Sequence, residues 1–302
     1  MVVETTKSAS SEINGGSIVV KRLLGLFPVQ IIRKQWPDLK SKTKEEAISA
    51  VVKAHPRSEI YDFVKQFVGL TKQNVYVLHT ENFKKLPDQF LEKIPLLSSP
   101  IEKKAGEYFY LADLIYDTFT RLPGEAGEDI KLLFKWPVRI TVAKDLVTVR
   151  CTIMEKHVQS YFPEGSLVFV RSRSMEETDI VKSVRDEICK TATCETCDLN
   201  KGIKALWETG AIDAPSARYK LATSTQTSAM DGDLLIKRDL PEKYKELIKV
   251  PLLKTVFKIL DDSDKHLSHF SINPSNGEIG FPMFSETEKA VDHVIREILR
   301  NN

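Results

Sequence analysis

Apolar residues near the start of the chain recur at helical spacing. Between residues 17 and 67 they fall three or four positions apart, which is the period of one helix face. Pro28, Pro37 and Pro56 divide this stretch, so the pattern predicts a small bundle of three helices. Thr43 followed by Glu46 matches a capping box and predicts where the second helix begins. The apolar positions that carry the pattern are Val19, Leu23, Leu24, Phe27, Ala47, Val51, Ile60, Phe63, Val64 and Phe67.

Beyond about residue 105 the pattern changes to runs of β-branched and aromatic residues, which are typical of strands. Residues 132–142 and 147–154 are two such runs, and the short gap between them predicts an antiparallel hairpin. A second hairpin turn is predicted at Pro274–Gly277. The other strands are expected at residues 75–78, 108–110, 166–171, 219–224, 234–238, 256–260, 269–272 and 279–283.

Helical spacing returns at residues 176–189, 202–209 and 286–299. Because these helices are inserted unevenly among the strands, the order predicts an α+β fold. We expect an N-terminal small helical bundle followed by a mainly antiparallel β-rich domain with inserted helices and a C-terminal helix. The expected parts are a disordered tail at 1–16, the helical bundle at 17–80, a connecting segment at 81–104 that contains a helix at 87–94, and the β-rich α+β domain at 105–302.

Composition indicates a folded intracellular protein. The chain has 302 residues and 42% of them are hydrophobic, which is enough to build sizeable cores. No apolar run approaches the roughly 20 residues of a membrane-spanning helix. Residues 1–16 lack the apolar segment of an export signal, and four cysteines in a chain of this length do not indicate a disulfide framework. We expect a cytoplasmic or nuclear location without membrane contact.

Basic residues are concentrated in the predicted bundle. Residues 17–60 contain nine Lys or Arg and four Asp or Glu, a surplus of five positive charges. Such a cluster, together with the exposed amides at the start of the second helix, could bind phosphates of a nucleic-acid backbone. The alternative is a solvated helix face without a partner. The candidate nucleic-acid-binding residues are Lys21, Arg22, Arg33, Lys34, Lys40, Lys42 and Lys44.

Cys189, Cys194 and Cys197 form a weak candidate metal site. The C-x-x-C pair has the spacing that wraps tetrahedral zinc, and Cys151 or His157 could complete the ligands. A zinc ribbon needs a second matched pair, however, and Cys189 continues the apolar face of a predicted helix. The favoured interpretation is a helix-to-loop segment with incidental thiols, so we expect no metal and no cofactor.

Acidic residues raise the alternative of a metal-dependent nuclease. Residues 231–236 resemble an acidic strand of such enzymes, but the core of that fold needs an acid-x-Lys on the next strand, and residues 256–260 contain none. Residues 261–266 with His269 could hold a divalent ion, although Asp and Ser are also the residues that turns favour. The chain has no glycine-rich phosphate loop and no G-x-S-x-G motif, so we expect no catalytic residues.

The order of parts resembles the centromere protein N family, in which a pyrin-like helical bundle precedes a β-rich domain. The likeness lies in residues 19–28, a first helix that ends at a proline step, in residues 44–48, which open a later helix, in the strand at 73–77, and in residues 161–171, a strand before a helix. The resemblance implies a non-enzymatic protein that binds DNA backbone and a histone-containing partner through basic residues. Those in matching segments are Lys21, Arg22, Lys42 and Lys44.

The sequence therefore predicts a non-enzymatic adaptor that binds a nucleic-acid backbone through its basic helical bundle. The expected partners are double-stranded DNA and an unidentified protein. Two alternatives remain open at this point: a protein–protein interaction module that binds no nucleic acid, and a metal-dependent nuclease.

Overall fold

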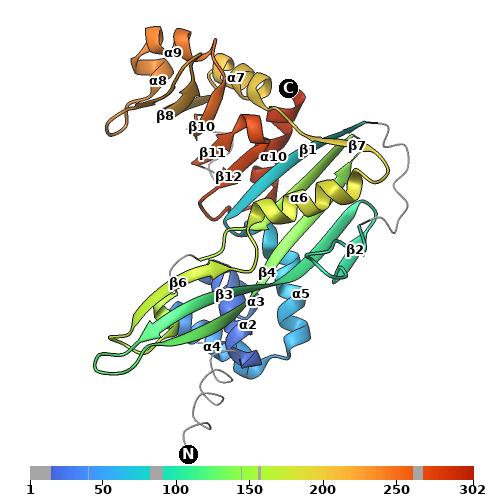
Figure 1. The fold of residues 1–302 in the computed structure, drawn as a ribbon, viewed down its shortest axis with the longest axis vertical. Helices are drawn as coiled ribbons and strands as arrows, with labels where there is room; N and C mark the ends of the chain where they lie inside the picture. Colours follow the sequence, from blue (N-terminus) through green and yellow to red (C-terminus); the bar gives the residue numbers. More distant parts are fainter. Residues whose placement is uncertain (1–14, 40, 82–90, 144, 156–157, 261–267) are drawn as a thin grey trace, which may run out of the picture. The chain divides into compact units, whose positions relative to one another are not determined.

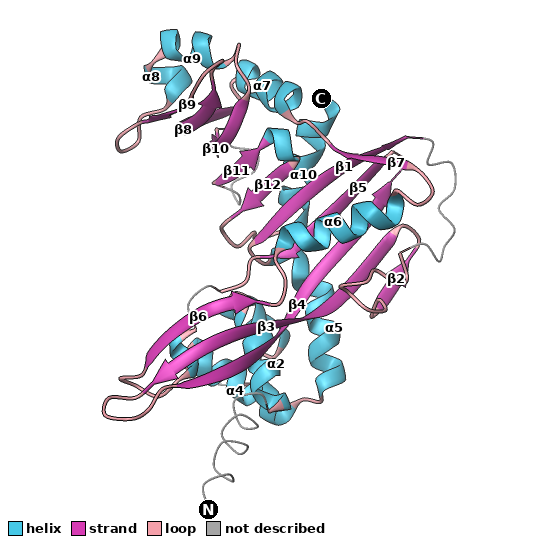
Figure 2. Cartoon of the chain, in the orientation of Figure 1, coloured by secondary structure: helices cyan, strands magenta, loops and turns pink. Residues whose placement is uncertain are grey.

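The computed structural model describes residues 15–39, 41–81, 91–143, 145–155, 158–260 and 268–302 (Figure 1). The fold is α+β, as predicted: helices near the N-terminus precede an antiparallel sheet with inserted helices and a last helix at the C-terminal end (Figure 2). Among the helices of these residues, none combines the length and apolar character needed to cross a membrane. Contacts divide the chain into two compact units: unit 1 contains residues 1–68, 88–139 and 152–186, and unit 2 contains 69–87, 140–151 and 187–302.

Within the described residues, four helices rather than the predicted three form the bundle of unit 1. They are α2 (Gly16–Gly25), α3 (Val29–Gln35), α4 (Lys44–Ala54) and α5 (Arg57–Phe67). The missed helix is α3, because its seven residues bury only Ile32 and so show almost no apolar period. The capping box is confirmed: Thr43 Oγ1 accepts from the Glu46 amide at 3.1 Å, and Glu46 Oε2 accepts from the Thr43 amide at 3.2 Å.

Aromatic contacts hold the centre of the bundle. The ring of Phe63 lies 4.9 Å from that of Phe27 and 4.8 Å from that of Trp36, and all three side chains are buried. Phe109 and Leu111 of the sheet belong to the same core, so the bundle buries its apolar face against strands of unit 1. Burial of these large side chains supplies the main stabilisation of the bundle, since four short helices are marginal by themselves.

Two long strands dominate the rest of unit 1. They are β3 (Glu107–Arg121) and β4 (Glu128–Ala143), whose last residues enter unit 2. The short strand β2 (Glu102–Lys104) pairs with the first residues of β3, and β6 (Leu167–Arg173) pairs with the last ones. Helix α6 (Glu177–Ile188) follows β6, and its predicted apolar stripe of Ile180, Val184 and Ile188 is buried.

Unit 2 contains the remaining strands and helices. Its strands are β1 (Gln73–Glu81), β5 (Leu146–Thr152), β7 (Thr193–Thr196), β8 (Ile212–Lys220), β9 (Thr225–Ala229), β10 (Leu252–Ile259), β11 (His269–Asn273) and β12 (Glu278–Phe281). Its helices are α7 (Asn200–Thr209), α8 (Ile236–Asp239), α9 (Pro241–Leu247) and α10 (Glu288–Arg300). The described strands pair in the order β2-β3-β4-β5-β1-β12-β11-β10-β8-β9, with β6 beside β3 and β7 beside β1.

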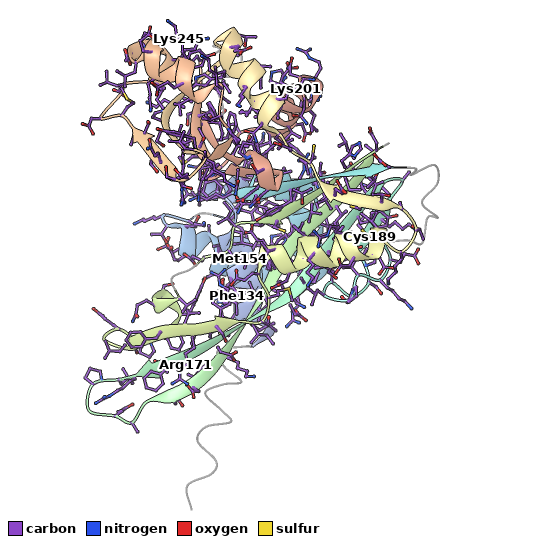
Figure 3. The ribbon with its side chains drawn as sticks, turned by 45° about the horizontal axis from the view of Figure 1, so that its top comes forward. Phe134, Met154, Arg171, Cys189, Lys201 and Lys245 are labelled. Carbon is purple, nitrogen blue, oxygen red and sulfur yellow. The ribbon has the colours of Figure 1, made fainter. Side chains whose placement is uncertain are left out.

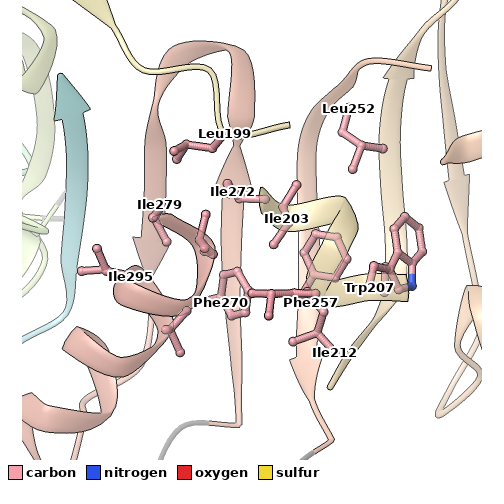
Figure 4. Close-up of a cluster of buried hydrophobic side chains, with 14 of the residues drawn as sticks. Leu199, Ile203, Trp207, Ile212, Leu252, Phe257, Phe270, Ile272, Ile279 and Ile295 are labelled. Carbon is pink, nitrogen blue, oxygen red and sulfur yellow. The ribbon is translucent and has the colours of Figure 1, made fainter. Parts of the chain in front are cut away.

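One face of the unit 2 sheet is covered by α7 and α10. Figure 4 shows Phe257 and Phe270 of neighbouring strands directed toward Trp207 and Ile203 of α7, with Ile295 of α10 beside them. The Trp207 ring lies 5.1 Å from that of Phe257 at an interplanar angle of 85°, an edge-to-face contact. The amphipathic stripe of α10 therefore completes a core that the strands begin, as its sequence period predicted.

Several local expectations were wrong or incomplete. Residues 236–239 form helix α8 where a strand was expected, and the strand expected at 219–224 lies at 212–220. Strand β9 was missed because its side chains are polar and mostly exposed, which leaves no alternation to detect. Of the helix expected at 87–94, residues 91–94 form a turn and a bend instead, with Ile94 in an isolated bridge to Ser98. Residues 87–90 lie outside the described residues, as do residues 1–14 of the expected tail.

The carboxylate of Asp213 explains why a helix replaces the expected strand. Its side chain is 2% exposed and accepts bonds from the backbone amides of Lys237 (2.9 Å) and Arg238 (3.0 Å), which orients the first turn of α8. It also accepts from Trp207 Nε1 at 2.9 Å and from the Ala214 amide at 2.7 Å. Asp213 lies more than twenty residues before α8 in the chain, so the sequence pattern around residues 236–239 does not show its effect.

We expect Asp213→Ala to lower the free energy of unfolding by about 3 kcal/mol, because it leaves several buried N–H donors without their charged acceptor. Urea unfolding followed by tryptophan fluorescence measures the change. Asp231→Ala is the control, since Asp231 is exposed on the loop before α8 and its loss is expected to change stability by less than about 0.5 kcal/mol. Equal effects of the two substitutions would contradict the role given to Asp213.

Candidate nucleic-acid interface

Three of the predicted basic residues gather where α3 approaches the turn before α4. Arg33 is exposed on α3, and its Nη2 donates to the backbone carbonyls of Ser41 at 3.2 Å and Lys42 at 2.9 Å. These bonds tie the turn to the helix, so Lys42 is held near Arg33 and its neighbour Lys34. We name Arg33, Lys34 and Lys42 the α3–α4 basic surface.

The lysines of this surface are available for a ligand. Lys34 and Lys42 are exposed, and within the described residues their ammonium groups form no hydrogen bond or ion pair. Lys21, half-buried on α2, likewise has no side-chain partner among the residues that the structure describes. Lys40 lies outside those residues. Mobile ammonium groups on an ordered backbone can follow phosphates without reading bases.

The start of α4 is closed to an anion, contrary to expectation. Thr43 accepts the Glu46 amide, and the Glu46 carboxylate binds the amides of Lys42 at 2.7 Å and Thr43 at 3.2 Å. The amide of Lys42 and then that of Thr43 lower the pKa of Glu46, so this carboxyl is ionised at neutral pH and occupies the amides that an anion would need. Lys44 donates to the carbonyl of Gly25, the last residue of α2, at 2.6 Å and thereby caps that helix. The capping box and Lys44 lie where the sequence predicts them, but their hydrogen bonds are made within the protein.

Arg22 is buried in the core of unit 1, so it does not belong to the basic residues that face solvent. It is 5% exposed, and its Nη1 donates to the backbone carbonyl of Leu133 on β4 at 2.8 Å. The guanidinium carbon lies 5.0 Å from the centre of the Phe134 ring and 4.8 Å from that of Tyr161. Burial lowers the pKa of Arg22. The sequence does carry a signal for this burial, because Arg22 falls within the apolar stripe of α2 together with Val19 and Leu23, which are also buried.

The three candidate zinc ligands occupy different surroundings. Cys189 is exposed at the end of α6 (Figure 3), and its Sγ lies 3.7 Å from the carbonyl oxygen of Cys194. The Cys194 side chain is buried on β7, while the half-buried Cys197 thiol accepts a bond from Asn302 Nδ2 at 3.6 Å. Burial, and then the charge of Asp198, raise the pKa of Cys197. Among the described residues no group of three or more His, Cys, Asp or Glu side chains is arranged to hold a metal ion.

The acidic segment at 231–236 does not form the expected strand. Asp233 lies in the turn before α8, and its carboxylate pairs with Lys258 of β10 at 3.3 Å. Residues 261–267 lie outside the described residues, so the second acidic candidate stays a prediction. His269 contacts the hydroxyl of Ser268 at 2.9 Å. No carboxylate of residues 231–236 therefore stands on a strand, where a nuclease core would hold it.

No protein-family model, curated protein or solved structure matches this chain. Its function is therefore argued from the chemistry of its surfaces.

We expect Arg22→Ala to lower the free energy of unfolding by about 3 kcal/mol, because a charged hydrogen bond and two cation–π contacts are lost from the interior. Urea unfolding measures the change. Lys21→Ala, on the same helix, is the control and is expected to cost less than about 0.5 kcal/mol. An Arg22→Ala protein of unchanged stability but weakened DNA binding would contradict the structural role and indicate that Arg22 contacts DNA.

Purified protein is expected to contain well under one zinc atom per chain, because a buried thiol with a raised pKa resists the deprotonation that zinc binding needs. Elemental analysis of protein prepared without chelators measures this. Stoichiometric zinc that disappears in the Cys194→Ser, Cys197→Ser double variant would contradict the expectation.

Proposed function

We propose that this protein is an intracellular, non-enzymatic adaptor that binds the backbone of double-stranded DNA through the α3–α4 basic surface and also binds a protein partner. Membership of the centromere protein N family, which the order of parts suggests, is part of this proposal. Arg33, Lys34, Lys42 and Lys21 are the DNA-contacting residues, with Lys40 as a further candidate.

The observation that carries the proposal is the pair of bonds from Arg33 to the carbonyls of Ser41 and Lys42. They order the turn, so that Lys42 is held beside the helix that carries Lys34. Within the described residues the ammonium groups of both lysines form no hydrogen bond or ion pair. Two or three cations on one ordered surface release counterions when they meet phosphates, which supplies sequence-independent affinity. Arg33 Nη2, one of the nitrogens that a bidentate contact to a base needs, already donates to the turn, and a lysine is a point charge without bidentate geometry.

A pure protein-interaction module is the second candidate, and one observation supports it. Strand β6 exposes Leu167 and Phe169 on a strand that pairs on one side only within the described residues. Exposed large apolar side chains on an unpaired edge are typical of a protein contact. An adaptor with both surfaces accounts for this observation and for the basic surface together. The nuclease alternative gains no support from Asp233, which is paired with Lys258 in a turn.

The test is a gel shift on random-sequence duplex DNA at several salt concentrations with Mg²⁺ present. The double variant Lys34→Ala, Lys42→Ala is expected to bind more weakly on every sequence. Its slope of log affinity against log salt should fall by about 0.9 for each lysine that contacted a phosphate. Base-independent weakening is expected because phosphate contacts position the duplex without reading it.

The matched control is Lys201→Ala, Lys249→Ala, which removes the same charge from exposed positions of unit 2 (Lys201 is labelled in Figure 3). It is expected to keep most of the affinity and the salt slope. No shift of the wild-type protein at low salt would contradict the proposal. Degradation of the DNA that Asp233→Ala abolishes would favour the nuclease instead.

A further inference from the structure

Strand β6 has a free edge. It pairs with β3 through six residue pairs, from Tyr116 with Arg173 to Arg121 with Leu167. Across the part of the chain that the structure describes, no strand pairs with its other side, and Figure 1 shows β6 at the margin of unit 1. The outward backbone N–H and C=O groups of such a strand are a template on which another strand can add.

Apolar side chains stand on this edge at alternate positions. Leu167 is 56% exposed and Phe169 is 58% exposed, the highest values among the exposed large hydrophobic residues of the described chain. Phe169 lies opposite Phe119 of β3. The Phe119 ring also lies so close to Gly127 that a Cβ atom at that position would collide with it. Half-buried Phe119 and exposed Phe169 thus form a small apolar patch on one face of the β3–β6 pair.

Strand β6 itself carries two arginines and no acid: it reads Leu-Val-Phe-Val-Arg-Ser-Arg. On β3, Arg121 stands opposite Leu167, and Asp117 stands opposite Ser172, whose hydroxyl donates to the Asp117 carboxylate at 3.0 Å. Within the described residues Arg121 makes no hydrogen bond or ion pair. The guanidinium carbon of Arg171, which Figure 3 labels, lies 5.1 Å from the centre of the Phe119 ring. Its Nη1 lies 3.0 Å from Asp129 Oδ1. Because both members of that ion pair are largely exposed, water screens it and a further carboxylate can share Arg171.

A backbone irregularity turns the basic side chains toward both faces. The pairing of β6 with β3 shifts between Asp117 and Thr118, which leaves Arg171 as the extra residue of a bulge. Arg171 lies over Phe119 on one face, whereas Arg173 lies 4.7 Å from the Tyr116 ring on the other and pairs with Glu176 at 3.4 Å. A strand laid along β6 would therefore meet an arginine on either side of its ladder.

We propose that β6 is the docking edge for an extended segment of a partner protein in which apolar residues alternate with acidic ones. The segment adds as a strand to the free edge of β6, its apolar side chains cover Leu167 and Phe169, and its carboxylates meet Arg171 and Arg121. Charge complementarity favours an acidic partner over a second copy of this chain. A second β6 would bring two more arginines and no acid, so pairing of two β6 strands would give no guanidinium a new counter-charge. This inference rests on the adaptor function proposed above, of which it specifies the protein partner.

The test uses two synthetic peptides of about eight residues, one alternating Val with Glu and one alternating Val with Lys, with the full chain and no nucleic acid. Fluorescence anisotropy is expected to show binding of the Val/Glu peptide at least about tenfold tighter than that of the Val/Lys peptide. Amide hydrogen exchange should show that the Val/Glu peptide protects β6 and leaves β9, an edge strand of unit 2, unchanged. Protection is expected because strand addition pairs backbone amides that were open to water.

The double variant Leu167→Ser, Phe169→Ser is expected to weaken binding of the Val/Glu peptide by about tenfold or more, since it removes two exposed apolar contacts. Leu234→Ser, Leu240→Ser is the matched control, because these leucines of unit 2 are similarly exposed and far from β6 in the chain. Equal affinity for the two peptides would overturn the inference, as would no binding at about 1 mM peptide. Self-association of the chain that Phe169→Ser abolishes would also overturn it. None of these results depends on DNA, so loss of DNA binding and loss of peptide binding are separate outcomes.

Discussion

Alternation of buried and exposed side chains along β4 and the second half of β3 is the constraint on which unit 1 depends. On β4, Ile130, Leu132, Phe134 and Trp136 point to one buried face, and the residues between them are partly or fully exposed. Because consecutive side chains of a strand lie on opposite faces, the five buried residues at 108–112 of β3 are covered on both faces, with Phe109 and Leu111 packed against the helical bundle. The β6 end of the sheet, where apolar side chains are exposed, is left for water or for a partner.

Arg22 shows how strictly the buried face is used. An arginine that lies within the apolar stripe of α2 has to enter the core, and it does so by bonding the Leu133 carbonyl and lying against two aromatic rings. A buried guanidinium is tolerated only when its donors and its charge are compensated. The bundle therefore presents a smaller basic surface than its composition indicates. The remaining cations collect where Arg33 orders the turn before α4.

The two proposed surfaces differ in physical character, which suits an adaptor. The α3–α4 basic surface offers mobile ammonium groups to a uniform polyanion, and its affinity depends on salt. The β6 edge offers directional backbone groups and apolar side chains, so its specificity comes from strand register and alternation. Each surface can therefore be altered by substitutions that leave the other intact.

Local sequence pattern determined much of the fold. The α+β class, the capping box at Thr43, most of strand β4 and the amphipathic C-terminal helix follow from local patterns that neighbouring residues express. Of β3 only residues 108–110 were expected, whereas the strand extends to Arg121. Trp36, Trp136 and Trp207, which lie beside proline or within apolar stretches of the sequence, are buried. These features depend on short-range preferences, which a single sequence displays directly.

Only the tertiary structure decided how a buried charge is compensated and which strand keeps a free edge. Arg22 and Lys21 are neighbours of the same chemistry, and the apolar stripe of α2 indicates which of them faces inward. The groups that compensate the buried guanidinium, Leu133 and Tyr161, are brought to α2 from far along the chain. Asp213 converts residues 236–239 into a helix from more than twenty positions away. The sequence predicts a strand at 166–171, but the exposure of its apolar residues depends on which strands pair beside it. Sequence by itself determined the elements of this protein, whereas contacts between distant residues determined its surfaces, because burial and pairing are properties of the assembled chain.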